Sequence, residues 1–196
     1  QWVDPDYFID YLIAQTYFAN GDMFNQKYWR SQDYTVRWRP VYYDLDLALS
    51  SSSPTRNILP SYFNAEGIPS QDGSLTNMDL YVGLRKNPDW CLAFGERYVY
   101  VVYNQFDPDR LTAILDDMAN QLRPEMQRHI QRWGAPSSME KWEKEVAELR
   151  ECLQERQSYA LKYLQREFDF TDEQMAQWEQ AAKAASSAAV SATPAP

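Results

Sequence analysis

The sequence predicts an α+β chain that is predominantly α-helical, with a small strand element near its N-terminus. From about residue 76 onward, apolar side chains recur at helical spacing between clear start and stop signals. Only residues 33–43 alternate apolar and polar side chains as a strand does. Of the 196 residues, 44% are hydrophobic and 15% are aromatic, which is enough for a substantial core and excludes a wholly disordered chain.

The first expected element is an amphipathic helix over residues 5–19. An Asp-Pro pair before it supplies an N-cap and a first-turn proline, and Gly21 is expected to end it as a left-handed C-cap residue. The predicted strand over residues 33–43 follows, with Pro40 at an edge, a bulge or a strand end. Residues 50–74 are rich in Ser, Pro, Gly and Asn, and we expect them to form a long loop.

The rest of the sequence predicts helices with capping signals. They are expected over residues 76–86, 87–105, 107–133, 138–167 and 171–185. The tail, residues 181–196, holds Ala, Ser, Thr and Pro with a single charge, which is typical of a linker or a disordered terminus. The predicted folded domain therefore covers residues 1–180.

The charge balance bears on the class of partner. Nineteen Lys and Arg against 28 Asp and Glu give a net charge of −9, which disfavours binding to nucleic acid or to an anionic membrane surface. No apolar run approaches the roughly 18 residues of a membrane span. The two cysteines, Cys91 and Cys152, are too few for a disulfide scaffold or a zinc ribbon. They could form one disulfide bond, but two buried thiols is the simpler interpretation because both lie in predicted helices.

Two acidic residues, Asp44 and Asp46, follow the predicted strand with one residue between them. Carboxylates at positions i and i+2 of an extended chain point to the same side, and they repel each other unless a cation lies between them. A hard divalent cation such as Mg²⁺ takes oxygen ligands of this kind. The alternative is a structural pairing with Arg37, with Arg39 or with a helix N-terminus, and the short spacing alone leaves the metal site and this alternative open.

A second group of polar residues, Asn20, Asp22 and Asn25, lies on the loop after the first helix. Turn and capping roles would explain each of them separately. Together with Asp44 and Asp46, however, they follow the order found in protein-kinase-like phosphotransferases. There an Asp orients or deprotonates the attacking hydroxyl, and an Asn and a later Asp hold the metal ions.

With these residues in place, the chain resembles the C-terminal part of the spore-coat CotH kinase family, atypical protein kinases of bacteria and some eukaryotes. The stretches that carry the resemblance are, in order, DPDYFIDYLIAQTYFANGDMFNQKYWR, RWRPVYYDLDLAL, RPEMQRHIQRWG and FDFTDEQM. The first two are the more specific, and together the four extend to about residue 178. The family has Trp before the first Asp of its W-D-L-D element where this chain has Tyr43, and often a polar residue where it has Gly21.

The resemblance implies that this chain forms the C-terminal lobe of an atypical protein-kinase-like fold. It further implies Mg²⁺- or Mn²⁺-dependent transfer of phosphate from ATP to hydroxyl groups of a protein substrate. The residues that it assigns are Asp22 as the catalytic residue, and Asn25, Asp44 and Asp46 as metal ligands. The loop over residues 50–74 would then lie beside the site, as an activation segment does.

The chain has 6 Gly and no glycine-rich phosphate-covering segment. We therefore expect an upstream half of the same polypeptide to grip the nucleotide, and the isolated chain to be inactive. One alternative is a non-catalytic cell-surface or spore-coat assembly module of the same fold, for which the tail would be an inter-domain linker. Another is an acidic helical interaction domain that binds no metal. Both the kinase interpretation and the assembly-module interpretation imply an extracellular, cell-surface or spore-coat location.

Overall fold

The computed structural model describes residues 2–22, 25–49, 53–64 and 77–191. Within these ranges the chain forms seven helices and one two-stranded sheet, so the predicted class, predominantly helical α+β, is confirmed. The elements are α1 (Pro5–Tyr17), β1 (Tyr28–Trp29), β2 (Arg39–Pro40), α2 (Leu59–Phe63), α3 (Asn77–Arg85), α4 (Pro88–Asn104), α5 (Pro108–Trp133), α6 (Met139–Phe168) and α7 (Asp172–Ser191).

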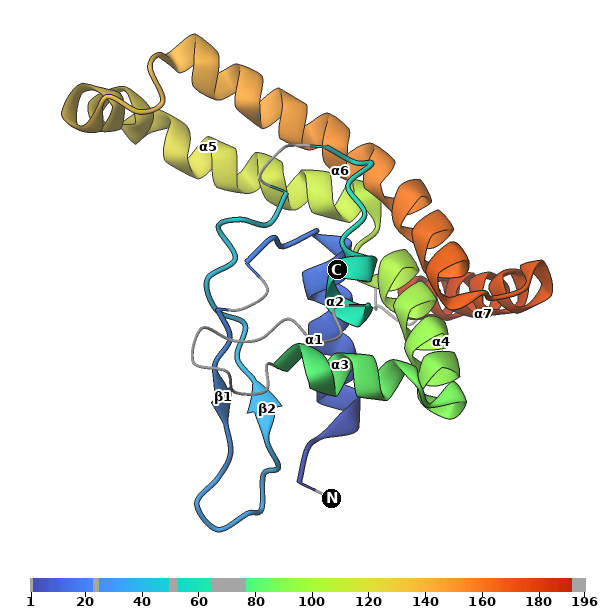
Figure 1. Cartoon of the computed structure of the whole chain (residues 1–196). Helices are drawn as coiled ribbons and strands as arrows, with labels where there is room; N and C mark the ends of the chain where they lie inside the picture. Colours follow the sequence, from blue (N-terminus) through green and yellow to red (C-terminus); the bar gives the residue numbers. More distant parts are fainter. Residues whose placement is uncertain (1, 23–24, 50–52, 65–76, 192–196) are drawn as a thin grey trace.

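Helix α1 runs through the middle of the body, with α2 and α3 beside it and α4 packed against it (Figure 1). Helix α7 packs on α4, and the main hydrophobic core lies among these helices and the C-terminal part of α6. Helices α5 and α6 form an antiparallel pair that extends from the body as an arm, with a small core of its own. The β-hairpin extends from the other side of the body (Figure 1).

The start of α1 agrees with the sequence signals. The Asp4 carboxylate accepts a hydrogen bond from the Tyr7 amide at 3.2 Å, and Pro5 occupies the first turn. Phe8 and Leu12 lie on the buried face of the helix. These local signals place α1 where the polar loop that follows it can reach the candidate site.

The end of α1 differs from the prediction. The helix ends at Tyr17, and the left-handed residue is Ala19, with a φ of 49°, rather than Gly21. The amide of Asn20 donates to the carbonyl of Gln15 at 2.9 Å, which is the long hydrogen bond of a Schellman motif. The left-handed residue therefore lies two positions before the predicted glycine.

The predicted strand over residues 33–43 is largely wrong. Its only paired part among the described residues is β2, apart from a bridge of Trp38 to Val3. The partner of β2 is β1, antiparallel, with Tyr28 opposite Pro40. Pro40 lies at the end of β2, as expected.

A side-chain-stabilised turn replaces the rest of that strand. The Asp33 carboxylate accepts hydrogen bonds from the backbone amide of Thr35 at 3.2 Å and from its hydroxyl at 2.9 Å. Tyr34 has a φ of 62°, which an extended strand does not allow. The alternation of apolar and polar residues therefore does not mark a buried face, and Tyr34 is 56% exposed.

The predicted helices of the C-terminal half are confirmed. The side chains of Asn87, Asp107 and Ser138 each cap the helix that follows, and Gly134 ends α5 with a φ of 69°. Residues 171–174 form the expected capping box. The backbone amide of Thr171 donates to the side chain of Gln174, and the backbone amide of Gln174 donates to the hydroxyl of Thr171.

Helix α7 continues to Ser191, past the predicted end at residue 185. Ala182 is 1% exposed, and its carbonyl accepts a hydrogen bond from the Asn104 side chain at 3.1 Å. Part of the segment expected to be a linker is therefore helical. Residues 192–196 lie outside the described part of the chain, and the division at residue 180 stays a prediction.

The segment predicted as a long loop contains helix α2. Leu59, Tyr62 and Phe63 of this short helix are buried in the main core. The described part of the segment is therefore packed structure, and residues 50–52 and 65–74 lie outside the described part.

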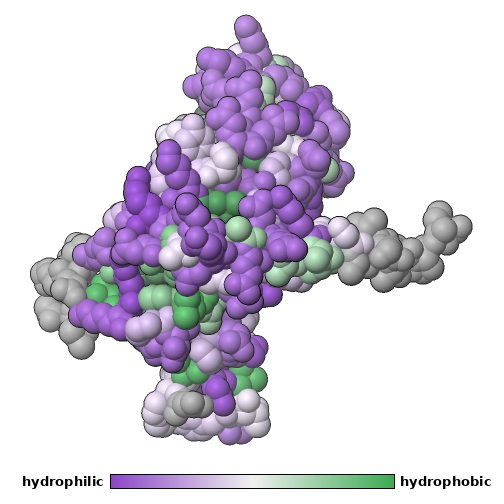
Figure 2. Space-filling view, turned by 90° about the vertical axis from the view of Figure 1, so that its right-hand side faces the viewer, coloured by the Kyte–Doolittle hydropathy of each residue, from purple (hydrophilic) through white to green (hydrophobic). Residues whose placement is uncertain are grey.

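Both cysteines are free thiols, Cys152 buried and Cys91 half-buried. No helix in the described ranges is long and apolar enough to cross a membrane. On the face shown in Figure 2 the arm is mostly hydrophilic, and hydrophobic residues form scattered patches over the body.

Candidate functional site

The four predicted site residues lie on two segments that meet beside the end of α1. The loop that leaves α1 carries Asp22 and Asn25, and the segment that leaves β2 carries Asp44 and Asp46. The side-chain amide of Asn25 donates a hydrogen bond to the Asp44 carboxyl. The structure therefore brings together predicted ligands from the two segments.

The two carboxyl groups of the D-x-D element face each other. The hydrogen bond between Asp44 and Asp46 raises the pKa of the Asp44 carboxyl, and partial loss of solvent and the negative charges of Asp46 and Asp22 raise it further. The hydrogen bond from Asn25 acts in the opposite direction. Both carboxyls are exposed to solvent, so a ligand can reach this concentration of negative charge.

A turn, rather than an extended strand, gives the two acids their common direction. Asp44 has a left-handed backbone with a φ of 53°, a conformation that Asp adopts more readily than most residues. The carbonyl of Leu45 then accepts a hydrogen bond from the amide of Ala48 at 3.0 Å. The amide of Leu49 donates to the carbonyl of Phe18 at 2.8 Å, which ties the segment to the end of α1.

Asn20 supports the loop that carries Asp22. It is 2% exposed, and its side-chain oxygen accepts a hydrogen bond from the Asp22 amide at 3.1 Å. Its side-chain nitrogen donates to the side chain of Gln15 at 2.7 Å, and Gln15 is also buried. The sequence predicted Asn20 as part of the polar loop but missed Gln15. The available signal was a polar residue on the otherwise apolar face of α1.

Gly21 has a spatial reason to be glycine. A Cβ atom added there would lie 2.7 Å from Nη2 of Arg56. The Arg56 guanidinium therefore passes close to the backbone beside Asp22 and would have to shift to admit a side chain at residue 21. Arg56 was not predicted at the site, because only the fold brings it next to the loop.

The alternative ion pair of the two acids with Arg37 or Arg39 is not formed among the described residues. Arg39 binds Asp4 at 2.7 Å, and Arg37 acts electrostatically on the same carboxylate. Lys27 places its ammonium 3.8 Å from the ring centroid of Tyr43. In the described part, neither acid of the D-x-D element forms an ion pair with a basic side chain.

The donor set fits a divalent cation that is shared with a substrate. Across the described ranges, no three His, Cys, Asp or Glu side chains are close enough to form a complete metal site. Asp44 and Asp46 with the amide of Asn25 supply oxygen donors, and Mg²⁺ commonly takes one or two carboxylates together with water and phosphate oxygens. The described residues therefore supply oxygen donors of the type that Mg²⁺ takes, but not a complete set of ligands.

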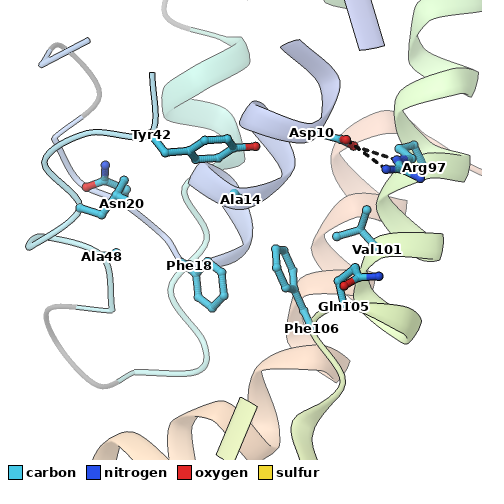
Figure 3. Close-up of a pocket in the computed structure, with 11 residues that line it drawn as sticks. Asp10, Ala14, Phe18, Asn20, Tyr42, Ala48, Arg97, Val101, Gln105 and Phe106 are labelled. Atoms are coloured by element: carbon cyan, nitrogen blue, oxygen red, sulfur yellow. Dashed lines mark hydrogen bonds and ion pairs between the residues drawn. The ribbon is translucent and has the colours of Figure 1, made fainter. Parts of the chain in front are cut away.

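A cavity of about 500 Å³ lies between α1, α4 and the segment of the acid pair. Its lining residues are mostly apolar: Asp10, Ala14, Phe18, Asn20, Tyr42, Leu45, Ala48, Arg97, Val101, Gln105 and Phe106. Figure 3 shows Phe18 and Phe106 side by side, and Arg97 bound to Asp10, with a nitrogen-to-oxygen distance of 2.7 Å. The Arg97 guanidinium is already paired with the Asp10 carboxylate and is therefore not free to bind a phosphate. The cavity is for this reason poorly suited to phosphates.

Comparison with protein families gave a match. A family model described as CotH kinase protein matches residues 1–160, a range that includes all four predicted site residues. Comparison with curated proteins and with solved structures gave no match.

Proposed function

We propose that this chain, which belongs to the CotH kinase family, carries the metal-binding and acceptor-activating residues of a protein kinase that uses ATP. The observation that supports this most directly is the hydrogen bond from Asn25 to Asp44. It links a predicted ligand on the loop after α1 to the acid pair, and phosphoryl transfer depends on bringing such residues together.

Asp44, Asp46 and the side-chain oxygen of Asn25 would hold Mg²⁺ or Mn²⁺. The cation, when bound, supplies positive charge that offsets the charge of the nucleotide phosphates. The neighbouring Asp46 raises the pKa of the Asp44 carboxyl, so protons compete with a cation for this site. The chain has a net charge of −9 and repels an anionic nucleotide, so the positive charge that a cation supplies is more important for binding the phosphates.

Asp22 would accept the proton of the acceptor hydroxyl as the oxygen attacks the terminal phosphate of ATP. Its carboxylate is near enough to the acid pair to act on the charge of Asp44, and its side chain is partly exposed. Asn20 fixes the backbone of Asp22 through a hydrogen bond to its amide. A general base positioned in this way contributes about 10² to 10⁴ to the rate.

The partners in this proposal are ATP and a protein with an accessible hydroxyl side chain. The family relationship also supports an extracellular, cell-surface or spore-coat location. The non-catalytic assembly module is the alternative, and it predicts a folded protein that transfers no phosphate.

Radiolabel transfer from ATP tests the proposal, with the protein as it is naturally encoded. Asp22→Asn and Asp44→Asn should each lower transfer by about 100-fold or more without changing the circular dichroism spectrum. Asp117→Asn is the matched control, because Asp117 lies on the arm and bonds only to Gln121 among the residues described. Transfer that survives in a folded Asp44→Asn protein would remove the metal role. A wild-type protein that binds Mn²⁺ but labels no acceptor would favour the assembly module.

A further inference from the structure

Arg156 of α6 is a charged side chain in the main body that is only 1% exposed. Burial of a guanidinium is costly unless its N–H groups are paired. The four acceptors are backbone carbonyl oxygens: Tyr17 at 2.6 Å, Pro54 at 2.6 Å, Arg56 at 2.7 Å and Thr16 at 3.2 Å. No carboxylate in the described ranges forms an ion pair with it, so its donors serve the backbone.

Two of these carbonyls belong to the last turn of α1. Thr16 and Tyr17 lie directly before the Schellman motif from which the Asp22 loop leaves. Carbonyls in the last turn have no partner within the helix, and a cation at this end interacts favourably with the helix dipole. Arg156 therefore stabilises the end of α1 at the point where the proposed catalytic loop begins.

The other two carbonyls belong to the segment that follows the acid pair. Helix α6 holds this segment at further points as well. The Tyr163 hydroxyl donates to the carbonyl of Thr55 at 2.7 Å, and Glu167 accepts from the side chain of Asn57 at 2.8 Å. Helix α6 thus holds both the end of α1 and residues 54–57. The segment with Asp44 and Asp46 is tied to the same end of α1, because the amide of Leu49 donates to the carbonyl of Phe18 at 2.8 Å.

We propose that Arg156 is a positioning residue that fixes the separation between the Asp22 loop and the Asp44–Asp46 segment. The consequence for catalysis rests on the proposed function. The planar guanidinium suits this task because its N–H groups diverge to carbonyls of two segments, Nη1 to one and Nε and Nη2 to the other. A lysine ammonium keeps the charge but has a single donor atom, so it cannot reproduce the bridge.

Hydrogen–deuterium exchange tests the bridge without reference to activity. Arg156→Lys should raise amide exchange over residues 41–49 by about tenfold, since the end of α1, to which Leu49 is bonded, loses its hydrogen bonds from Arg156. Exchange in α4 should change much less. Arg150→Met is the matched control, because Arg150 lies on the same helix but binds Asp116 of α5. Unchanged exchange over residues 41–49 in folded Arg156→Lys, or an equal rise throughout the molecule, would overturn the proposal.

A second measurement on the wild-type protein decides the question even where the variants do not fold. If the bridge couples the segments, then Mn²⁺ or Mg²⁺ bound at the acid pair must in turn stabilise the bridge. Exchange of the Arg156 Nε–H and of the amides of residues 55–57 should therefore slow on titration with Mg²⁺. Slowing confined to residues 41–49 contradicts the coupling. If no cation binds at all, the proposed function is contradicted instead. The amide exchange of Arg156→Lys then still tests whether Arg156 holds the two segments together.

Discussion

Asp44 combines two unfavourable features, a left-handed backbone and a carboxyl group that faces another carboxyl group. Each of these is costly for an ordinary surface residue, and together they are typical of positions kept for function. The hydrogen bond from Asn25 offsets part of the repulsion. A cation would offset much more of it, which gives the acid pair a physical reason to bind one.

The raised pKa of Asp44 predicts how cation binding depends on pH. Protons compete with the cation, so Mn²⁺ affinity should be highest where both acids are ionised and should fall as the pH drops through the raised pKa of Asp44. Asp46→Asn removes the largest cause of the shift and should move the midpoint of this fall to lower pH, with weaker binding overall. Isothermal titration between pH 4 and 7 measures both effects. An identical midpoint in the two proteins would contradict the assignment.

Residue types at the candidate site were predictable, but the contacts that support them were not. The spacing of Asp44 and Asp46 indicated a facing pair, although a turn rather than a strand produces it. Arg156 could not be predicted, because its partner carbonyl on Tyr17 lies 139 positions away in the sequence. A buried arginine bonded to backbone leaves no pattern of paired charges in the sequence.

At the scale of elements, local signals were reliable and long-range pairing was not. Capping residues and Gly134 placed α4, α5 and α6 because each signal acts within one helical turn. The strand over residues 33–43 was overestimated because alternation alone does not reveal the turn at Asp33 and Tyr34. The exposed aromatic rings of that hairpin show that its periodicity reflects no buried face.

The packing of α4 against α7 gives a prediction with a matched control. A Cβ at Gly95 would lie 2.5 Å from Phe170 Cε2 and 2.8 Å from Trp178 Cζ3, so Gly95→Ala should destabilise the protein by about 1–3 kcal/mol through overpacking. Gly83 of α3 has no atom within 4 Å of the same position, and Gly83→Ala should stabilise by about 0.5–1 kcal/mol through helix propensity. Urea unfolding measures both. Equal changes in the two variants would show that α7 does not pack as described.

At the scale of the whole molecule, the two hydrophobic clusters separate the body from the arm. The arm cluster consists of Ala119, Met126 and Trp142. Ion pairs between α5 and α6, such as Arg123 with Glu143 at 2.7 Å, lie on its surface and contribute little each. The candidate site lies in the body, and among the described residues the arm helix that bonds to the segments around it is α6, through its C-terminal half. The outer arm should therefore be dispensable for the geometry of the site.

Trp142→Ala tests this separation. Trp142 is 8% exposed, and its removal leaves a cavity in a small cluster, which should destabilise the arm by about 3 kcal/mol or more. Because the arm cluster is separate from the main core, amide exchange should rise in α5 and in the N-terminal half of α6 but not in α1 or α4. Mn²⁺ affinity at the acid pair should stay within about twofold of wild type, since a substitution has little effect on residues that are distant from it and share no contacts with it. A large loss of Mn²⁺ affinity in the folded variant would mean that the arm positions the site, and would extend the role argued for Arg156 to the whole length of α6.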